Sequence, residues 1–348
     1  VFSTGHSKRS MLLLSFALLV GFLILFKSAD YFVIGAVTTA RNFHISPMIV
    51  GLTIVALGTS APEIFVAVTS SLQGEPELAV GNAIGSNIAN IGMVLGITAL
   101  ITPLPFRDDI LKKDLPIMFL VTLCAGATLV DFHLGFWDGL LLFACLATFL
   151  YRLAHEHLAN RTAESEAEND KPHAQPESAA NYEQEYISEL DEITDMSQQK
   201  AVLTLILSLV FLLLSSELLV WAVVKIAHQM GVSELIIGLT VVAIGTSLPE
   251  LVVSVTSAVK GETDLAIGNI VGSNIFNMLA VLAIPCLLAP TEIASNVFWR
   301  DFGLMFGLTV LLGFFAYGFS GRSRISRPEG GILLLAWLGY IGSLYFGF

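Results

Sequence analysis

The chain has 348 residues, of which 55% are hydrophobic and only 13% are charged. Its mean hydropathy of +0.77 excludes a water-soluble globular domain and predicts an integral membrane protein surrounded by the lipid bilayer. The net charge of −12 comes mostly from one segment, Glu156 to Asp195, so it says little about the membrane body. We expect no enzyme activity, no cofactor and no nucleic-acid partner. The sequence indicates neither a monomer nor an oligomer.

Apolar runs long enough to cross a bilayer recur along the chain. Five precede a polar insert, at Met11–Val37, Pro47–Leu72, Leu78–Thr102, Leu115–Val130 and Gly135–Leu150. Five follow the insert, at Ala201–His228, Glu234–Val259, Leu265–Leu288, Phe298–Phe319 and Gly330–Phe346. The predicted fold is therefore an all-α membrane protein with about ten transmembrane helices.

Because five is odd, the second group of spans must enter the membrane from the opposite side. Residues 11–153 and 200–348 are thus predicted to form two five-helix repeats of inverted topology, joined by an acidic linker, residues 154–199. If the N-terminus is external, the basic residues outside the spans fall mostly on the inside, and only four fall outside: Lys8, Arg9, Lys225 and Arg300. The positive-inside rule favours a protein of the cell (inner) membrane with both termini external and a cytoplasmic linker.

The linker is rich in Glu, Asp, Ala, Gln and Asn and poor in apolar residues, which predicts a mostly disordered or partly helical segment. It clusters carboxylates, so a regulatory cation site is conceivable. It lacks, however, the alternating ligand spacing and the sharp-turn glycine of a calcium loop, and a solvated linker is therefore favoured.

One pair of sequence blocks occurs twice, at a constant offset of 187 residues, the separation of Glu63 and Glu250. The first block reads Gly-Thr-Ser-Ala-Pro-Glu at 58–63 and Gly-Thr-Ser-Leu-Pro-Glu at 245–250. The second reads Gly-Asn-x-x-Gly-Ser-Asn at 81–87 and at 268–274. Each copy places one carboxylate and several hydroxyls inside apolar sequence.

A carboxylate in the middle of a membrane costs at least about 2.5–3.5 kcal/mol, so an ion, a proton or a partner must offset it. Neither repeat core contains a Lys or Arg, and Lys27 cannot pair with both Glu63 and Glu250. A mobile cation is therefore the simplest occupant. Lys27 lies three residues from Asp30 on one helix and can pair there instead.

Proline precedes each carboxylate, at Pro62 and Pro249, and cannot donate a backbone hydrogen bond. Each helix is therefore expected to kink or break at this point. Freed carbonyls, such as those of Ala56 and Ala243, would then face inward beside the Thr and Ser hydroxyls.

The second block adds polar residues spaced four apart on one helix face, namely Asn82, Ser86 and Asn90, and again Asn269, Ser273 and Asn277. Together with the carboxylates they can supply the six to eight oxygens that calcium prefers. No His or Cys is among them, which argues against zinc or copper. A single Ser, Thr or Asn in a span more often joins helices, and we interpret Asn82 and Asn269 as packing or helix-end residues.

The paired Gly-Thr-Ser-x-Pro-Glu and Gly-Asn-x-x-Gly-Ser-Asn blocks resemble the two alpha-repeats of the calcium/cation antiporter superfamily, and within it a prokaryotic sodium/calcium exchanger. The resemblance implies that Glu63 and Glu250 are central carboxylates shared by calcium and sodium. It implies flanking sodium sites made by Thr59, Ser60, Thr246 and Ser247 with the carbonyls of Ala56 and Ala243. Further oxygens would come from Ser86, Ser273 and Asn90. The first and sixth spans would slide across the other eight.

One position departs from that pattern, because some sodium/calcium exchangers have Asp where this chain has Asn277. Two carboxylates still neutralise a divalent ion. The expected function is antiport of sodium and calcium by alternating access, and the alternative is a proton-coupled calcium or cation antiporter. Proton/calcium exchangers of the superfamily usually read Gly-Asn-Ala-x-Glu around the carboxylate, so Thr-Ser-x-Pro-Glu favours sodium.

Two further classes are less consistent with the sequence. A passive channel can also select cations with carboxylates, but the inverted repeats with broken helices favour antiport. An intramembrane protease would need an Asp pair or a Ser-His arrangement within its spans, and the sequence places its histidines at loops or span ends.

Overall fold

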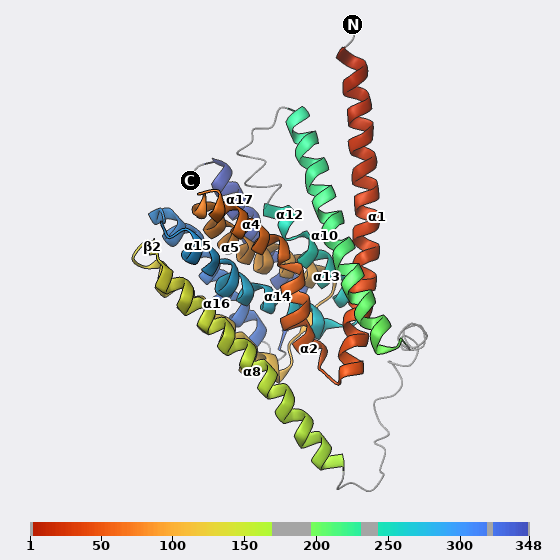
Figure 1. The fold of residues 1–348 in the computed structure, drawn as a ribbon, viewed down its shortest axis with the longest axis vertical. Helices are drawn as coiled ribbons and strands as arrows, with labels where there is room; N and C mark the ends of the chain where they lie inside the picture. Colours follow the sequence, from red (N-terminus) through yellow and green to blue (C-terminus); the bar gives the residue numbers. More distant parts are fainter. Residues whose placement is uncertain (1–2, 169–195, 231–242, 319–322, 347–348) are drawn as a thin grey trace.

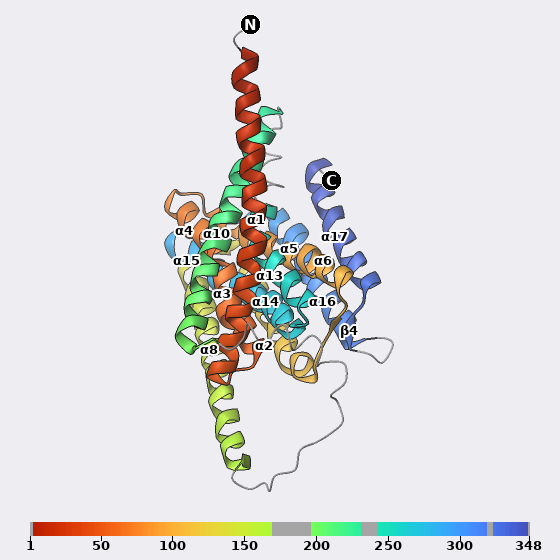
Figure 2. The same ribbon diagram turned by 90° about the vertical axis from the view of Figure 1, so that its right-hand side faces the viewer.

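The computed structural model describes residues 3–168, 196–230, 243–318 and 323–346. Nearly all elements are helices, which pack into one bundle (Figure 1). Helices α1 (Ser3–Phe43) and α10 (Gln198–Gln229) lie side by side along one flank and extend past the other helices (Figures 1 and 2). They cross the bundle in opposite directions, α1 downward and α10 upward in Figure 1.

We call one end of the bundle the terminal side and the opposite end the linker side (Figure 1). At the terminal side, α1 begins and α17 (Arg327–Phe346) ends. At the linker side, α8 (Phe136–Glu168) ends and α10 begins. The two chain ends of the described structure therefore lie opposite the point where the linker leaves.

The elements between α1 and α8 are helices, π-helical segments and two short strands. In chain order they are α2 (Pro47–Val50), η1 (Gly51–Val55), α3 (Ala56–Thr59), α4 (Ala61–Leu72), α5 (Pro76–Ala89), η2 (Asn90–Leu95), α6 (Gly96–Ile101), β1 (Leu104–Pro105), η3 (Ile110–Asp114), α7 (Leu115–Leu129) and β2 (His133–Leu134).

The elements that follow α10 resemble those of the first half. In chain order they are α12 (Ala243–Thr246), α13 (Leu248–Val259), α14 (Thr263–Phe276), η5 (Asn277–Val281), α15 (Ala283–Leu288), β3 (Thr291–Glu292), η6 (Val297–Phe302), α16 (Gly303–Tyr317), β4 (Arg324–Ile325) and finally α17.

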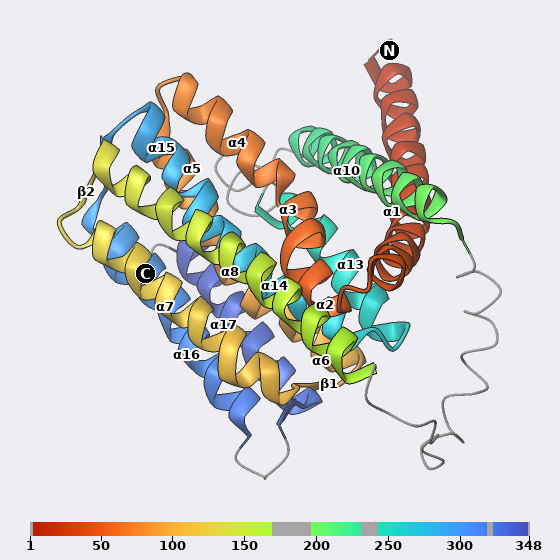
Figure 3. The same ribbon diagram turned by 60° about the horizontal axis from the view of Figure 1, so that its bottom comes forward.

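The predicted spans coincide with helices wherever the structure describes them, and residues 234–242 of the span Glu234–Val259 lie outside the described residues. By length and composition, six described helices are able to cross a membrane, and a bent pair adds a seventh. The structure adds four two-residue strands that the all-α prediction lacked. They form two antiparallel pairs, β1 with β4 and β2 with β3, at opposite ends of the bundle, so each pair joins the two halves of the chain (Figure 3).

Helix α8 runs well past the predicted end of its span at Leu150 and continues to Glu168, so the first part of linker 154–199 is helical. Arg152 donates two hydrogen bonds to Glu156 one turn later, at 3.1 and 3.0 Å, which supports the helix where it leaves the apolar span. The rest of the linker, residues 169–195, lies outside the described residues.

Two polar-lined segments occupy the centre of the bundle. Within their most apolar stretches, 94% of the residues of Thr263–Leu288 and 78% of those of Pro76–Ile101 are buried, against 22% for α1. Figure 3 shows α14 enclosed by its neighbours. These are the segments that carry the repeated Gly-Asn-x-x-Gly-Ser-Asn blocks, so the fold places the polar residues of those blocks away from lipid.

Candidate cation site

The two carboxylates predicted to be central are both buried. Glu63 lies in the first turn of α4 with 0% of its surface exposed, and Glu250 lies in the first turn of α13 with 1% exposed. The helix axis bends by 43° between Pro47–Thr59 and Ala61–Leu72, which confirms the break predicted at Pro62. The break directs the beginning of α4, and with it Glu63, into the bundle.

Each carboxylate accepts a serine hydrogen bond at one oxygen, and its other oxygen has no hydrogen-bond donor among the described residues. The Ser60 hydroxyl donates to Glu250 Oε1 at 3.1 Å, and the Ser86 hydroxyl donates to Glu63 Oε1 at 3.4 Å. Both Oε2 atoms are buried and accept no hydrogen bond from the described residues. Within the same part of the chain, neither carboxylate forms an ion pair.

The hydroxyls of one half of the chain reach the other half. Thr59 Oγ1 donates to Asn269 Oδ1 at 3.1 Å and lies 3.5 Å from Ser273 Oγ. The Thr246 side chain hydrogen bonds to Glu63 in the corresponding crossed direction. The two broken helices therefore meet at their breaks, and the predicted residues of both repeats come together.

Several more polar atoms at this point are buried without a partner among the described residues. They include both side-chain polar atoms of Asn90 and of Asn277, and the hydroxyl of Ser247. Asn90 begins η2 and Asn277 begins η5, so a widened π-helical turn starts at each. A buried polar group without a partner costs about 1–3 kcal/mol, so a group of them needs a ligand that supplies the missing interaction.

Asn82 and Asn269 fasten helices to one another. The Asn82 amide donates to the Glu63 carbonyl at 3.3 Å, and the Asn269 amide donates to the Glu250 carbonyl at 3.4 Å. Asn269 has a second task, because its Oδ1 accepts from Thr59. Both were predicted to be packing or helix-end residues, and the contact of Asn269 with Thr59 is an addition that the sequence did not indicate.

The backbone carbonyls differ from the expectation. The Ala56 carbonyl is not freed, because it accepts from the Ser60 N–H at 3.0 Å and from Thr59 Oγ1 at 3.3 Å. A proline has no N–H to donate to the carbonyl four residues earlier in the helix. The carbonyls that lose their usual donor are therefore those of Gly58 and Gly245. The Gly245 carbonyl accepts from the Ser216 hydroxyl of α10 at 3.1 Å. The Ala56 carbonyl already accepts two hydrogen bonds, so it would bind a cation only in place of one of them. The role of the Ala243 carbonyl stays a prediction.

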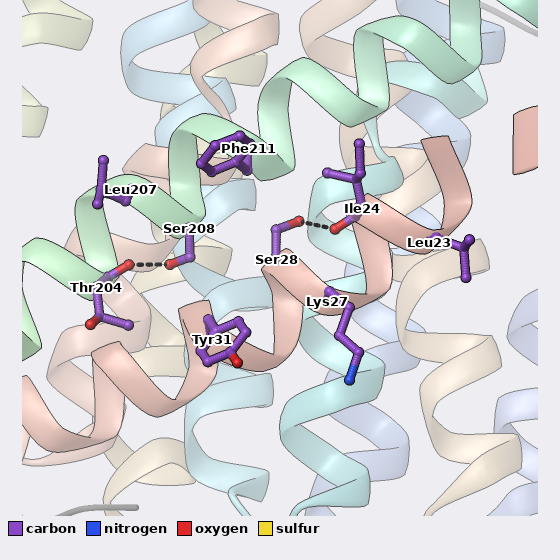
Figure 4. Close-up of a pocket in the computed structure, with 9 residues that line it drawn as sticks. All are labelled: Leu23, Ile24, Lys27, Ser28, Tyr31, Thr204, Leu207, Ser208 and Phe211. Carbon is purple, nitrogen blue, oxygen red and sulfur yellow. Dashed lines mark hydrogen bonds between the residues drawn. The ribbon is translucent and has the colours of Figure 1, made fainter. Parts of the chain in front are cut away.

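The expected local pair of Lys27 with Asp30 is wrong. Asp30 instead pairs with Lys260, at the end of α13, at 3.3 Å. Lys27 lines a pocket of about 560 Å³ between α1 and α10, and its amine extends away from Ser28 and Ser208 (Figure 4). The surface of that pocket is mainly apolar, and neither Glu63 nor Glu250 lines it.

A pocket at the terminal side lies next to a residue that bonds to Glu63. A pocket of about 300 Å³ is lined there by α5, η6 and α17, and Asn82 and Ser86 form part of its wall. Gly81 and Gly85 face it, with no atom within 4 Å of an added Cβ. Since Ser86 also bonds to Glu63, this pocket ends one side chain away from Glu63, which itself is buried and does not line it.

On the linker side, the equivalent surface of α14 is covered. A Cβ built at Gly268 would lie 2.8 Å from the Met48 carbonyl oxygen and 3.1 Å from the Leu52 nitrogen. The backbones of α2 and η1 are therefore packed directly on α14 where the glycines allow it. The linker-side pocket next to this contact measures about 120 Å³ and ends at Met48, Ile49 and Leu52.

The described residues hold no group of three His, Cys, Asp or Glu side chains arranged to bind a metal ion. A cation at this point would take its charge balance from Glu63 and Glu250 and the rest of its coordination from neutral oxygens. Hard cations such as calcium and sodium accept such ligands. Two buried carboxylates among neutral oxygens, in a bundle of apolar helices, are the features of a membrane cation transporter.

Comparison with known proteins identifies the family. The family model described as sodium/calcium exchanger protein matches residues 13–154 and 200–346. The antiporter CaxA of Alkalimonas amylolytica is 44% identical over 330 residues, which cover 95% of this chain and 98% of that protein. The inner membrane protein YrbG of Escherichia coli is 36% identical, covering 95% of each chain. The chain belongs to the sodium/calcium exchanger family of antiporters.

Solved structures agree with this assignment. The sodium-calcium exchanger NCX_Mj, soaked with sodium and strontium, superposes with a TM-score of 0.77 at 29% sequence identity, covering 96% of this chain and 99% of that one. The resemblance to a prokaryotic sodium/calcium exchanger, based on the two repeated blocks, is thus confirmed at the level of family.

Proposed function

We propose that this protein exchanges sodium for calcium across the membrane through one central site. The observation that carries the proposal is the pair Glu63 and Glu250, each buried with one carboxylate oxygen lacking a hydrogen-bond donor among the described residues. Two negative charges without a fixed cationic partner are balanced by one divalent ion or by monovalent ions. Because both kinds of ion need the same carboxylates, their binding is mutually exclusive, and that exclusion couples the two fluxes.

The proposed ligand set extends beyond the carboxylates to the oxygens around them. The calcium ion and the sodium ions are substrates that draw on Thr59, Ser60, Ser86, Asn90, Thr246, Ser247, Ser273 and Asn277, with the carbonyls of Ala56 and Ala243. The unpartnered buried atoms of Asn90, Asn277 and Ser247 support this set, because a bound cation would satisfy the side-chain oxygens. The crossed contact of Thr59 with Asn269 supports a single site shared by both halves.

The transport cycle is proposed to alternate access between two inverted five-helix repeats, with ten spans in all. The open glycines Gly81 and Gly85 and the covered glycine Gly268 support a terminal-side-open conformation. In the opposite conformation, α14 would be uncovered and α5 covered, with α1 and α10 sliding across the rest. A cation must occupy the site during this step, because an uncompensated double negative charge is costly away from water.

We also propose that both termini are external and that the linker is cytoplasmic. The excess of Lys and Arg in the loops on the linker side supports this orientation. Calcium would then be collected from the cytoplasm and released outside, while sodium moves inward.

A proton-coupled antiporter is the second candidate. It is favoured by one observation: Asn277, at the beginning of η5, is neutral, so Glu63 and Glu250 are the carboxylates of the proposed site. With only two buried carboxylates, protonation of both would leave a neutral pocket able to return without any metal ion.

The deciding experiment is calcium-45 uptake into proteoliposomes loaded with sodium and diluted into sodium-free, potassium-free buffer at fixed pH. We expect uptake that disappears when internal sodium is replaced by choline. Uptake that ignores sodium but follows an imposed pH gradient would reject sodium coupling in favour of proton coupling. Flux that needs no counter-ion at all would reject antiport.

A further inference from the structure

The pockets at the two ends of the bundle correspond through the 187-residue repeat. Equivalent positions line them, Glu77, Arg300, Asp301 and Tyr340 on the terminal side and Asp264, Lys113, Asp114 and Leu153 on the linker side. Each pocket thus has an acidic residue at the start of a central helix and a basic-acidic pair on a π-helical segment. The two differ in the partners that surround the second acid.

On the terminal side, Asp301 is fully engaged. Arg300 binds it with two hydrogen bonds, from Nε at 2.7 Å and from Nη2 at 3.1 Å. The Tyr340 hydroxyl donates to the same carboxylate at 3.0 Å. Three donors and one fixed positive charge leave little capacity for a mobile cation there.

On the linker side, Asp114 is buried, with only 7% of its surface exposed, and its carboxylate borders the 120 Å³ pocket. The position of the tyrosine is taken by Leu153, which has no hydroxyl. Within the described segments, no hydrogen bond and no ion pair within 4.0 Å joins Asp114 to another residue, although Arg152 and Lys113 are its charged neighbours. A buried carboxylate that faces a polar cavity without a donor is stabilised by a proton or a cation from solution.

The basic side chains close to Asp114 are held by another acid. Arg152 binds Glu156 Oε1 at 3.0 Å, and Lys113 lies 3.9 Å from the same oxygen. Asp264 is paired with Arg107 at 3.1 Å on the rim of the pocket. Even with all three basic groups counted, the four carboxylates around the pocket leave a net negative charge with Asp114 as the acid lacking a partner.

We propose that the linker-side pocket is a staging site for a divalent cation, with Asp114 as its main ligand, a proposal that rests on the proposed function. The ion keeps most of its water, since one buried carboxylate and the more exposed Asp109 and Asp264 do not enclose it. Weak binding suits transit: the site concentrates calcium beside α14 without trapping it.

The route onward is defined by the terminal-side pocket, in which the equivalent surfaces lead to Asn82 and Ser86. On the linker side the same path would lead to Asn269 and Ser273, and it is closed where Gly268 meets Met48 and Leu52. When that contact opens, Asp114 lies at the mouth of the path. Asp114, the acid without a partner among the described residues, thus lies on the side from which calcium would be collected.

The test is calcium-45 exchange for unlabelled calcium in membrane vesicles of both orientations, a reaction that needs no sodium and so survives a failure of sodium coupling. Asp114→Asn should raise the half-saturating calcium concentration at the linker side about five- to tenfold. The value at the terminal side should change less than about twofold. The matched control is Asp108→Asn, which removes a charge on the same side of the bundle at a side chain that is 77% exposed and does not line the pocket, and it should have little effect.

Glu156→Gln provides a second variant that leaves Asp114 intact. It frees Arg152 and Lys113 to neutralise Asp114, so it should also weaken calcium binding at the linker side. An unchanged linker-side value in both variants, or an equal rise on both sides, would overturn the proposal.

If the wild-type protein showed no calcium self-exchange, the proposed function would fall and the pocket would be tested directly. Mn²⁺ binding would then be measured in solubilised protein carrying Glu63→Gln and Glu250→Gln, with the free ion followed by electron paramagnetic resonance. Loss of one weak site on adding Asp114→Asn would uphold the pocket, and identical binding curves would reject it.

Discussion

The contact between Gly268 and the backbone of α2 and η1 gives a direct test of alternating access. In Gly268→Ala the new methyl group would lie 2.8 Å from the Met48 carbonyl oxygen and 3.2 Å from the Gly51 Cα. These neighbours are backbone atoms, which cannot rotate away as a side chain can. Overpacking of this kind costs typically about 1–3 kcal/mol, which here falls only on the conformation closed toward the linker side.

The matched variant is Gly81→Ala, at the equivalent position of the first repeat. No atom lies within 4 Å of the added Cβ, so the conformation open to the terminal side is not penalised. The two substitutions introduce the same methyl group into central helices and differ only in what it meets. A penalty of 1–3 kcal/mol corresponds to a population shift of about 5- to 150-fold toward the linker-side-open state for Gly268→Ala alone.

The assay follows a cysteine at Val66, which lines the terminal-side pocket, in a background without Cys124, Cys145 and Cys286. A membrane-impermeant maleimide applied from the terminal side should label it more slowly in Gly268→Ala, in proportion to the population lost. Gly81→Ala should label as fast as the parent or faster. Equal rates in Gly268→Ala and the parent, or slowing in Gly81→Ala, would refute the assignment of the two glycines to opposite gates.

Two further predictions concern charged groups. Glu63→Gln and Glu250→Gln should each abolish calcium exchange while the protein still folds. Calcium is expected to raise the melting temperature of the wild type and not that of either variant; full exchange activity in either variant would contradict the assignment. Lys260→Gln removes the pair with Asp30, in which the two side chains are 26% and 42% exposed, so it should cost less than about 1 kcal/mol. Val66→Cys labelling should therefore slow about fivefold at most, and acceleration would contradict a role for this pair in holding the terminal-side-open state.

The site residues that sequence could predict are those whose chemistry is inconsistent with a membrane interior. Glu63 and Glu250 had to be accounted for wherever the helices packed, because an isolated carboxylate in hydrocarbon is too costly. Pro62 also predicted the helix break, since the loss of a backbone donor is independent of context. Such local rules predicted a break beside each carboxylate, and the structure has both carboxylates in the first turn of a helix inside the bundle.

What sequence could not predict depended on contacts between distant segments. Asp30 was paired with Lys27 because three residues separate them on a helix, yet the fold brings Lys260 to it instead. The Ala56 carbonyl was expected to be free, but the chain keeps its hydrogen bond with Ser60 up to the break and shifts the loss to the next turn. Both errors arise because local spacing defines which pairs are possible and packing decides which of them form.

The differences between the two halves are distributed unevenly through the fold. At the centre, Glu63 and Glu250, Ser86 and Ser273, and Asn90 and Asn277 are chemically identical pairs, which suits an ion that must be bound equally well from either side. Near the ends the pairing changes, since Asp114 lacks the tyrosine that holds Asp301, and Lys260 occupies the position equivalent to Gln73. A symmetric centre sets what is bound, and asymmetric ends set from which side it arrives and which conformation is preferred. Substitutions that make the ends alike should therefore change sidedness and resting conformation without changing which ions the centre accepts.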